Sequence, residues 1–309
     1  LSAHPPPARP SLAGVFLSLS PRGPRMSARL AVLPPYLRPK QALTQLTGKL
    51  AGLEGGSATT AVIRWFIQRY KVNMSEALEA DPAAYKSFNQ FFTRPLRPGV
   101  RPLADADWVC PVDGAISQLG RITGAAGDQI FQAKGHHYST QALVGGDAAL
   151  AAQFAHGHLA TIYLSPRDYH RIHMPCAGRL LRMIYVPGEL FSVNPTTARG
   201  VPGLFARNER VVCVFEGEFG PFVLVLVGAT IVGSMATVWH GVVNPPRPGT
   251  LRDWDYQAQN IHLHRGDEMG RFLLGSTVVL LMPQGDLQFT ADWQATRPVR
   301  LGEAMAQQG

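Results

Sequence analysis

The sequence predicts an α+β protein, in which N-terminal helices precede a β-rich body. Three observations favour this class. Glycine and proline are numerous, with 31 and 25 residues among 309, which is typical of a loop-rich protein with much β-structure. The first third of the chain carries helical patterns interrupted by prolines. The remainder carries short runs of β-branched residues between Gly/Pro turns, which indicates strands.

The composition restricts the partners that the chain could bind. The formal charge of +8 and the isoelectric point near 9.7 favour an acidic partner, such as anionic lipid, nucleic acid or a phosphorylated substrate. No Lys/Arg block with interleaved aromatic residues occurs, so we do not expect nucleic acid. Cys110, Cys176 and Cys213 are far apart and have no C-x-x-C spacing, which indicates a reducing compartment.

Residues 1–25 differ from the rest of the chain, because they are rich in Pro, Arg and Ser. The first interpretation is an upstream extension, with the natural start at Met26. The second is a targeting peptide, since basic residues are frequent and no acidic residue occurs before Glu54. The apolar piece Leu12–Leu19 is too short to span a bilayer.

Residues 26–100 are expected to form a helical, membrane-associating region. Helices are predicted over 29–72 with proline breaks, and over 76–92 with a break at an Asp-Pro pair, before a linker at 93–99. Residues 61–71 combine aromatic and aliphatic residues with three cations and no acid. This pattern fits an interfacial helix on an anionic membrane. It fits equally well a helix that covers the protein's own core with a solvated basic face.

Residues 101–309 are expected to form the β-rich body. Val211–Phe215, Phe222–Val227 and Val278–Met282 each predict a strand, because aliphatic and β-branched residues dominate them. Residues 221–239 carry no charge, so a transmembrane helix has to be considered there. Gly, Ser and Thr interrupt this stretch and valine dominates it, which favours two buried strands joined by a turn.

The Gly275-Ser276 bond lies between a Gly/Arg-marked loop and the last of these predicted strands. Gly275 has no side chain, so its carbonyl is open to attack and its backbone can be strained. The Ser276 hydroxyl could attack that carbonyl if a base took its proton. Two other Gly-Ser pairs occur, at residues 56–57 and 233–234, so the dipeptide alone is a weak signal.

Residues 165–175 offer a candidate base. Ser165 and Asp168, with a proline between them, predict a capped helical turn that places His170 and His173 on one face. The histidines could be metal ligands, surface residues or a base beside a nucleophile, since neutral imidazole accepts a proton at about pH 7. No carboxylate or cysteine at a matching spacing completes a metal site, so no metal is expected.

Asp113 supplies the remaining residue type of a nucleophilic site. It lies in Pro111-Val112-Asp113-Gly114, which by itself is a turn signature. Asp113, His173 and Ser276 together have the residue types of an Asp-His-Ser set, and such sets occur in several sequence orders. The serine does not lie in a G-x-S-x-G elbow.

With these residues the chain resembles the phosphatidylserine decarboxylase proenzymes, specifically the bacterial type without a transmembrane anchor. The similarity extends from about Met26 to Met282. Two departures are mild: Leu273-Leu274 where a basic residue often stands, and the N-terminal extension. Several motifs in the family's order carry the resemblance: Phe88-Asn89-Gln90-Phe91-Phe92-Thr93-Arg94, Pro111 to Gly114, Lys134-Gly135-His136-His137-Tyr138, Ser165 to Pro175, Asn208-Glu209-Arg210, Val227-Gly228-Ala229, Glu268-Met269-Gly270-Arg271-Phe272 and Leu274-Gly275-Ser276-Thr277.

The resemblance implies a self-processing enzyme. Ser276, activated by His173 and oriented by Asp113, would attack the Gly275 carbonyl and convert the amide to an ester. Loss of the Ser276 α-proton would then eliminate the Gly275 carboxylate. The dehydroalanine left behind would hydrolyse to a pyruvoyl group and release ammonia. The products would be a large chain ending at Gly275 and a small chain starting at the pyruvoyl group.

The resemblance also implies a chemical role for that pyruvoyl cofactor, derived from Ser276. Its ketone would form a Schiff base with the amine of phosphatidylserine and accept the electrons released as CO2 leaves, which gives phosphatidylethanolamine. His170 is expected to act on the substrate, as an acid or as a carboxylate contact. Arg271 or Lys134 is expected to meet the lipid phosphate.

Partners and location follow from the resemblance and from the basic N-terminal helices. We expect the helices to hold the protein on an anionic membrane surface, at the cytoplasmic face of a bacterial inner membrane, and we expect a homodimer. Two alternatives remain open. One is a lipid-binding membrane homologue that never matures, and the other is a pyruvoyl decarboxylase of a soluble amine.

Overall fold

The computed structural model describes residues 51–229, 234–244, 247, 249–273 and 276–309, with the backbone alone for Ser276. The extension expected at the N-terminus, the first part of the expected helical region and Gly275 lie outside the described residues. Within them, the chain contains short helices and many antiparallel strands, which confirms the α+β class.

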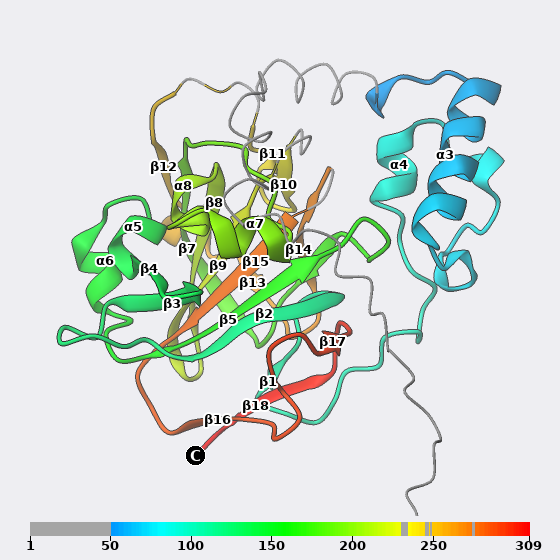
Figure 1. The fold of residues 1–309 in the computed structure, drawn as a ribbon. Helices are drawn as coiled ribbons and strands as arrows, with labels where there is room; N and C mark the ends of the chain where they lie inside the picture. The colour runs from blue at the N-terminus through cyan, green and yellow to red at the C-terminus, as the bar shows by residue number, and fades with distance from the viewer. Residues whose placement is uncertain (1–50, 230–233, 245–246, 248, 274–275) are drawn as a thin grey trace, which may run out of the picture.

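A nine-stranded antiparallel sheet forms the centre of the body (Figure 1). Its order is β12-β7-β8-β9-β15-β5-β2-β17, and β13 also pairs with β7. The strands predicted at residues 211–215, 222–227 and 278–282 are confirmed as β8, β9 and β15. The bounds are β2 (Gly114–Arg121), β5 (His158–Leu164), β7 (Gly178–Val186), β8 (Arg210–Gly217), β9 (Gly220–Val227), β12 (Arg252–Asp255), β13 (His262–Leu263), β15 (Ser276–Met282) and β17 (Pro298–Val299).

β15 is an interior strand of this sheet, with β9 on one side and β5 on the other. Successive side chains of a strand point to opposite faces, so β15 contributes to two separate cores. Val279 and Leu281 belong to one core, and Val278 and Leu280 belong to the other. Burial on both faces explains why the sequence of this strand is apolar throughout rather than alternating.

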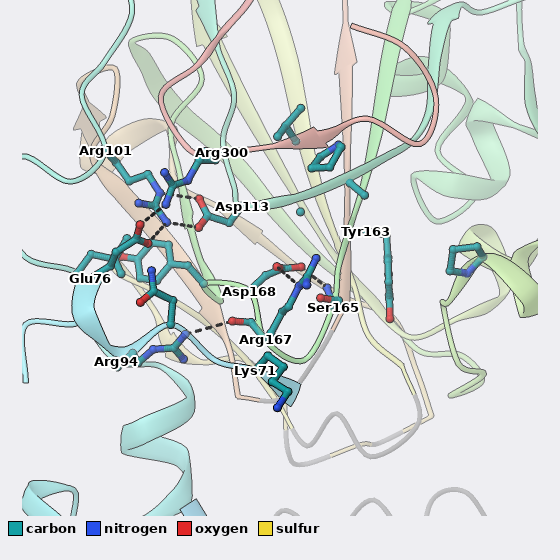
Figure 2. Close-up of a pocket in the computed structure, with 18 residues that line it drawn as sticks. Lys71, Glu76, Arg94, Arg101, Asp113, Tyr163, Ser165, Arg167, Asp168 and Arg300 are labelled. Carbon is teal, nitrogen blue, oxygen red and sulfur yellow. Dashed lines mark hydrogen bonds and ion pairs between the residues drawn. The ribbon is translucent and has the colours of Figure 1, made fainter. Parts of the chain in front are cut away.

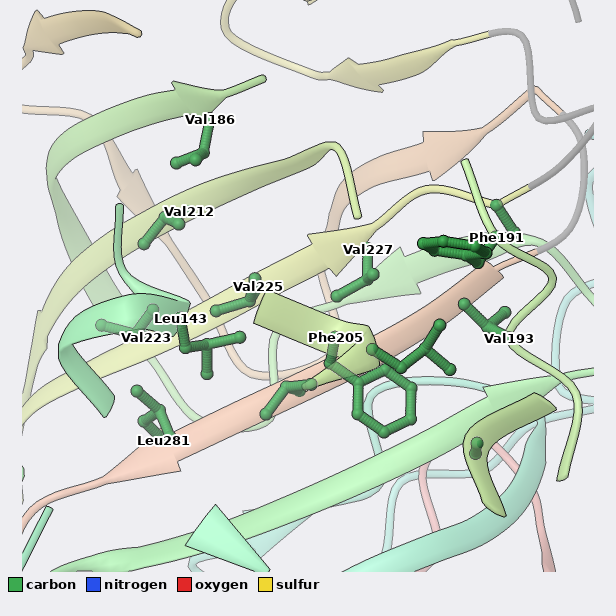
Figure 3. Packing of buried hydrophobic residues seen from close by; sticks show 14 of the residues in the cluster. Leu143, Val186, Phe191, Val193, Phe205, Val212, Val223, Val225, Val227 and Leu281 are labelled. Carbon is green, nitrogen blue, oxygen red and sulfur yellow. The ribbon is translucent and has the colours of Figure 1, made fainter. Parts of the chain in front are cut away.

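Short helices and a hairpin cover the first face of the sheet (Figure 3). Phe205 and Leu143, from two of these helices, pack with Val225 and Leu281 of the sheet in a single core. The covering elements are β3 (Gln129–Ala133), β4 (His136–Ser139), α5 (Thr140–Leu143), α6 (Ala148–Ala152), α7 (Pro195–Gly200) and α8 (Leu204–Arg207).

Two small antiparallel sheets pack through the second core. One has the order β11-β10-β14-β6 and the other β1-β18-β16. Ile172, Met269 and Trp108 bring both sheets into the core that also holds Val278. Their strands are β1 (Trp108–Val109), β6 (Arg171–His173), β10 (Met235–Thr237), β11 (Gly241–Val242), β14 (Glu268–Phe272), β16 (Leu287–Phe289) and β18 (Ala304–Gln308).

The uncharged stretch over residues 221–239 contains most of β9 and all of β10, which confirms the strand interpretation. Residues 230–233, between the two strands, lie outside the described part of the chain. The two strands belong to different sheets, a separation that the sequence did not predict. Among the residues that the structure describes, no helix is long and apolar enough to cross a membrane.

The N-terminal helical segment lies beside the body (Figure 1). Its longest helix buries Ile63 and Phe66, as expected of a helix that covers a core, and it exposes Val62 and Trp65. The helix expected over 76–92 is mostly turns, because capping side chains and Pro82 favour short 3-10 segments. The elements are α3 (Ser57–Tyr70), η1 (Met74–Glu76), η2 (Pro82–Ala84) and α4 (Phe88–Phe92).

Candidate active site

Asp113 directly precedes β2 and is held firmly in place. Its Oδ1 accepts hydrogen bonds from Arg101 Nε and from the Leu301 amide, both at 2.9 Å. Its Oδ2 accepts from Arg101 Nη2 at 2.5 Å. The guanidinium thus binds the carboxylate with two parallel hydrogen bonds, the geometry that arginine favours. The residue after it is glycine because a Cβ at Gly114 would lie 2.5 Å from the carbonyl oxygen of Tyr163 in β5.

His173 ends β6, and its amide donates to the Pro111 carbonyl at 2.9 Å. Its Nδ1 lies 2.8 Å from the Gly266 carbonyl, so this nitrogen carries the proton and donates. Nε2 therefore holds the lone pair and accepts from the Tyr169 hydroxyl at 3.1 Å. Burial lowers the pKa of His173 below its ordinary value, which keeps the imidazole neutral.

Asp113 and His173, which were expected to act together on Ser276, do not hydrogen-bond to each other. Both ring nitrogens of His173 meet other groups, and both oxygens of Asp113 meet Arg101. The two residues are nevertheless close enough for the negative charge of Asp113 to raise the pKa of His173, against the larger effect of burial. Gly266 and Tyr169, rather than Asp113, therefore make the hydrogen bonds that orient the ring.

His170 is completely buried and packs on Phe92, with ring centroids 4.1 Å apart. Its Nδ1 donates to the Asp168 carbonyl at 2.8 Å. Its Nε2 is buried and has no hydrogen-bond partner among the described residues. Burial lowers the pKa of His170 to about 3, so the ring is neutral. The end of β14, four residues before Ser276, lies next to it, because the Phe272 amide donates to the His170 carbonyl at 3.0 Å.

The helical turn expected to carry both histidines is only partly present. Ser165 and Asp168 form a closed turn, with the Ser165 amide donating to Asp168 Oδ2 at 2.7 Å. The chain then becomes extended, and β6 pairs with β14. The expectation that His170 and His173 share a helical face is therefore wrong. The alternation of polar Arg171, apolar Ile172 and polar His173 is a strand signal that could have indicated this.

Ser276 is the first residue of β15, and its Cα partner across the sheet is Leu164 of β5. Phe272 is the last residue of β14, which belongs to a different sheet. The chain therefore crosses between two sheets over residues 273–275, immediately before Ser276. Thr277 follows with its side chain fully buried, and its hydroxyl has no hydrogen-bond partner among the described residues.

A cavity of about 550 Å³ opens beside the start of β2 and the loop after β5 (Figure 2). Ser165, Asp113 and Tyr169 line it. Ser165 directly follows Leu164, the residue of β5 that pairs with Ser276. The N-terminal segment supplies part of the opposite wall through Lys71 and Arg94. The other lining residues are Asn73, Glu76, Leu96, Arg101, Gly114, Ala115, Tyr163, Arg167, Asp168, Pro195, Pro298, Val299 and Arg300.

The two cations expected to meet a lipid phosphate do not line this cavity. Arg271 lies on β14, with its side chain 3.9 Å from Glu268. Lys134 is exposed at the turn between β3 and β4. Tyr169 and Arg94 do line the cavity, and neither was among the functional residues predicted from the sequence. Their positions within Ser165–Pro175 and Phe88–Arg94, two of the motifs already singled out, were the available signal.

The fold and this geometry can be compared with known proteins. A family model described as phosphatidylserine decarboxylase matches residues 88–307, and a second model, PSD, matches residues 30–71. The chain belongs to the phosphatidylserine decarboxylase family. It is 73% identical over 280 residues to the phosphatidylserine decarboxylase proenzyme of Azoarcus sp. (strain BH72), covering 91% of this chain and 96% of that protein. It is 74% identical over 281 residues to the proenzyme of Variovorax paradoxus (strain S110), covering 91% and 98%.

Members of the phosphatidylserine decarboxylase family are decarboxylases, and the resemblance identified from the motifs is thereby confirmed. The relative in Dechloromonas aromatica (strain RCB) carries the same proenzyme name, with 71% identity over 280 residues. The covalent group that the resemblance implies has to fit the residues present. Two buried polar atoms without partners among the described residues, His170 Nε2 and Thr277 Oγ1, lie in the segments around the Ser276 backbone and are consistent with such a group.

Proposed function

We propose that this chain is a self-processing phosphatidylserine decarboxylase that cuts itself between Gly275 and Ser276. The mature enzyme would convert phosphatidylserine to phosphatidylethanolamine and CO2. The observation that carries the proposal is the position of Ser276. It begins a central strand directly after a crossing between sheets, beside a cavity that contains Asp113 and the Tyr169 partner of His173.

Cleavage uses residues of this chain alone. Ser276 Oγ attacks the Gly275 carbonyl carbon and gives its proton to His173 Nε2. The imidazolium returns that proton to the amide nitrogen as the C–N bond breaks, which leaves a free amine and an ester that joins the two residues. Removal of the Ser276 α-proton then expels the Gly275 carboxylate. Hydrolysis of the resulting dehydroalanine releases ammonia and leaves the pyruvoyl group. The Gly266 carbonyl supports the first step, because it fixes the tautomer with the lone pair on Nε2.

Asp113 contributes to cleavage as a fixed negative charge. When His173 accepts a proton, the imidazolium is stabilised by a carboxylate that cannot move away, because Arg101 and the Leu301 amide hold it. The Tyr169 hydroxyl occupies Nε2 in the described conformation, so it must release the nitrogen or pass the proton along before Ser276 can react.

The pyruvoyl group supplies an electrophilic carbonyl that ordinary side chains lack, and it acts as an electron sink during decarboxylation. His170 is the residue that we assign to the substrate. Its burial excludes water and keeps the ring neutral, so the lone pair on Nε2 is available to accept a hydrogen bond from a protonated group of the substrate. The Asp168 carbonyl, by accepting from Nδ1, holds the ring in the tautomer that this hydrogen bond requires.

Membrane attachment belongs to the same proposal. α3 exposes Val62 and Trp65, and the neighbouring cations Arg64 and Arg69 are exposed as well. An apolar pair flanked by cations suits the interface of an anionic membrane, where each cation contributes about 1 kcal/mol. We place the enzyme at the cytoplasmic face of a bacterial inner membrane, bound peripherally, and as a homodimer.

Intact mass spectrometry and denaturing gels test the proposal. The active enzyme should contain two chains, of which the smaller begins with a pyruvoyl group in place of Ser276. The Ser276→Ala variant should remain a single inactive chain of 33.5 kDa. Ser57→Ala, at another Gly-Ser pair, is the matched control and should mature normally. An active preparation that consists only of full-length chain would refute self-processing.

The substrate class is tested separately with vesicles. Mature enzyme should float with vesicles that contain phosphatidylserine and should release CO2 from that lipid. The double variant Val62→Ser, Trp65→Ser should lose most of its flotation yet keep its fold, because both side chains are largely exposed. An enzyme that ignores anionic vesicles while decarboxylating a soluble amine would instead be the soluble-substrate alternative.

A further inference from the structure

We propose that Arg94, together with Lys71 and Arg167, binds the phosphodiester of the substrate's head group in the 550 Å³ cavity. This inference rests on the proposed function and extends it by assigning a phosphate site. The cations first expected to meet the phosphate, Arg271 and Lys134, do not line this cavity. The site lies on the wall formed by the end of the N-terminal segment and by the loop after β5 (Figure 2).

Arg94 is a buried cation without a counter-ion among the described residues. Its residue is only 3% exposed. Its Nη2 donates to the Arg167 carbonyl at 3.3 Å, and its Nε is buried with no hydrogen-bond partner among the described residues. The guanidinium also lies over the Phe91 ring, 5.4 Å from its centroid. A buried charge is costly unless it is paired, so an unpaired guanidinium at a cavity is suited to binding an anion.

Two neighbouring arginines of the cavity and one buried arginine elsewhere have partners that Arg94 lacks. Arg101 contacts both Asp113 and Glu76, and Arg300 contacts Glu76. Arg210, the comparable buried arginine elsewhere, donates to three backbone carbonyls at 2.6 to 2.8 Å. These arginines are satisfied by the fold itself, whereas the Arg94 guanidinium makes one long hydrogen bond and its contact with the Phe91 ring.

Lys71 and Arg167 add positive charge at the exposed side of the same cavity. Lys71 terminates α3 and is exposed, and the structure assigns no ion pair to it among the described residues. The Arg167 side chain is 63% exposed and reaches Asp168 only at 3.8 Å. Five cationic and three acidic side chains line the cavity, so its lining carries an excess of positive charge. An anion entering from solvent would therefore meet two cations before it reaches Arg94.

The position of Arg94 suits an anion that is part of the reacting molecule. Its charge is near enough to His170 to lower the pKa of that ring, in addition to the larger effect of burial. Ser165, which lines the cavity, follows the strand partner of Ser276. A phosphodiester held at Arg94 would thus leave the amine of the same head group free to extend toward His170 and the pyruvoyl group.

Binding of soluble probes to the full chain tests the site directly. We would titrate glycerophosphoserine, inorganic phosphate and L-serine by isothermal calorimetry. Glycerophosphoserine should bind, and Arg94→Gln should weaken its binding about ten- to a hundredfold, since a charge-assisted hydrogen bond is lost. Arg182→Gln is the matched control, because Arg182 pairs with Asp147 and Asp253 and does not line the cavity. The Arg182→Gln variant should bind glycerophosphoserine as tightly as the wild type.

The probes also distinguish two sources of the anion. Tighter binding of glycerophosphoserine than of inorganic phosphate supports a head-group site. Phosphate binding through Arg94 without glycerophosphoserine binding would overturn the proposal in favour of a free-phosphate site. Equal binding of L-serine would also overturn it, because L-serine has no phosphate.

Two exposed variants keep the test decisive if Arg94→Gln does not fold. Lys71→Gln and Arg167→Gln should each weaken glycerophosphoserine binding severalfold and raise KM for the lipid without slowing self-cleavage. Unchanged affinity in both would refute the site. The outcome is separable from the proposed function, because head-group binding by a chain that never cleaves itself would support the anion site and reject self-processing.

Discussion

The Tyr169 hydroxyl donates a hydrogen bond to Nε2 of His173 across 3.1 Å, and their rings lie 5.7 Å apart between centroids. This contact covers the nitrogen that accepts the proton of Ser276 in the proposed mechanism. A hydrogen bond to the lone pair of an imidazole favours its neutral form, so Tyr169 helps to keep His173 unprotonated. It also occupies Nε2 and must release that nitrogen before His173 can act as a base. In the described conformation, His173 is thus neutral and hydrogen-bonded to Tyr169 through Nε2.

The pH dependence of self-cleavage should report the state of His173. Neutral imidazole is the active form, and burial lowers its pKa below the ordinary value of 6.5. Cleavage should therefore be fast above that pH and should slow only as the pH falls through the lowered pKa. Rates measured on gels for freshly refolded precursor, from acidic to neutral buffers, check this. A rate that increased on acidification would exclude His173 as the base.

Tyr169→Phe should move that acidic limb to higher pH. Removing the donor to Nε2 removes a contact that favours neutral imidazole, so the pKa of His173 should rise toward its ordinary value. The measurement is the same cleavage profile. Tyr163→Phe, at another partly buried tyrosine that lines the cavity, is the control and should leave the profile unchanged. Identical profiles for wild type and Tyr169→Phe would show that the contact has no influence on the base.

Asp113→Asn should separate a structural role from a chemical one. The pair with Arg101 is largely buried, so the variant should lose about 2–3 kcal/mol of unfolding free energy in urea. It should also stop cleavage, since the charge that stabilises imidazolium is gone. Arg101→Gln should cost a similar free energy but still cleave, because the carboxylate remains. If both variants cleave equally well, Asp113 has only a structural role.

Thr277→Val should affect chemistry more than stability. The Thr277 hydroxyl is buried and unpartnered within the described part of the chain, so its replacement by a methyl group should leave Tm unchanged or raise stability by up to about 1 kcal/mol. Maturation or decarboxylation should slow at least severalfold, with Thr277→Ser retaining most activity. A fully active Thr277→Val enzyme would show that the hydroxyl has no part in the reaction.

Gly114→Ala should destabilise the sheet beside the cavity. The new Cβ would lie 2.5 Å from the Tyr163 carbonyl oxygen, so β2 and β5 would have to separate. We expect a loss of about 1–3 kcal/mol in denaturant unfolding, together with slower cleavage. Gly52→Ala is the control, since its Cβ would meet only the Asn89 side chain at 3.8 Å. Equal stability of the two variants would contradict the close approach.

The parts of the fold that the sequence predicted are those with a local cause. The continuous apolar run of Val278–Met282 predicted a strand buried on both faces, and β15 is such a strand. Asp113-Gly114 predicted a turn; Asp113 lies in a bend, whereas Gly114 is already the first residue of β2. Periodicity and turn residues act within a few positions, so one sequence is enough to recognise them.

The parts that the sequence did not predict depend on distant partners. β6 has three residues and is extended because it pairs with β14, nearly a hundred positions away. Arg94 is distinguished by what it lacks, and the hydrogen bonds that satisfy Arg101 and Arg210 come from elsewhere in the chain. No local pattern tells a paired arginine from an unpaired one, so the anion site required the structure.

The interior position of β15 has a consequence for the fate of the cut chain. This strand is hydrogen-bonded to β9 along one edge and to β5 along the other. Two later strands, β17 and β18, pair with β2 and β1 from the other side of residue 276 in the chain. A nick before Ser276 would leave the fragments entwined, so they would co-elute as a single particle under native conditions and part only on denaturation. A separately produced C-terminal fragment should not bind to the folded protein, because both neighbours of β15 in the sheet are already paired with it.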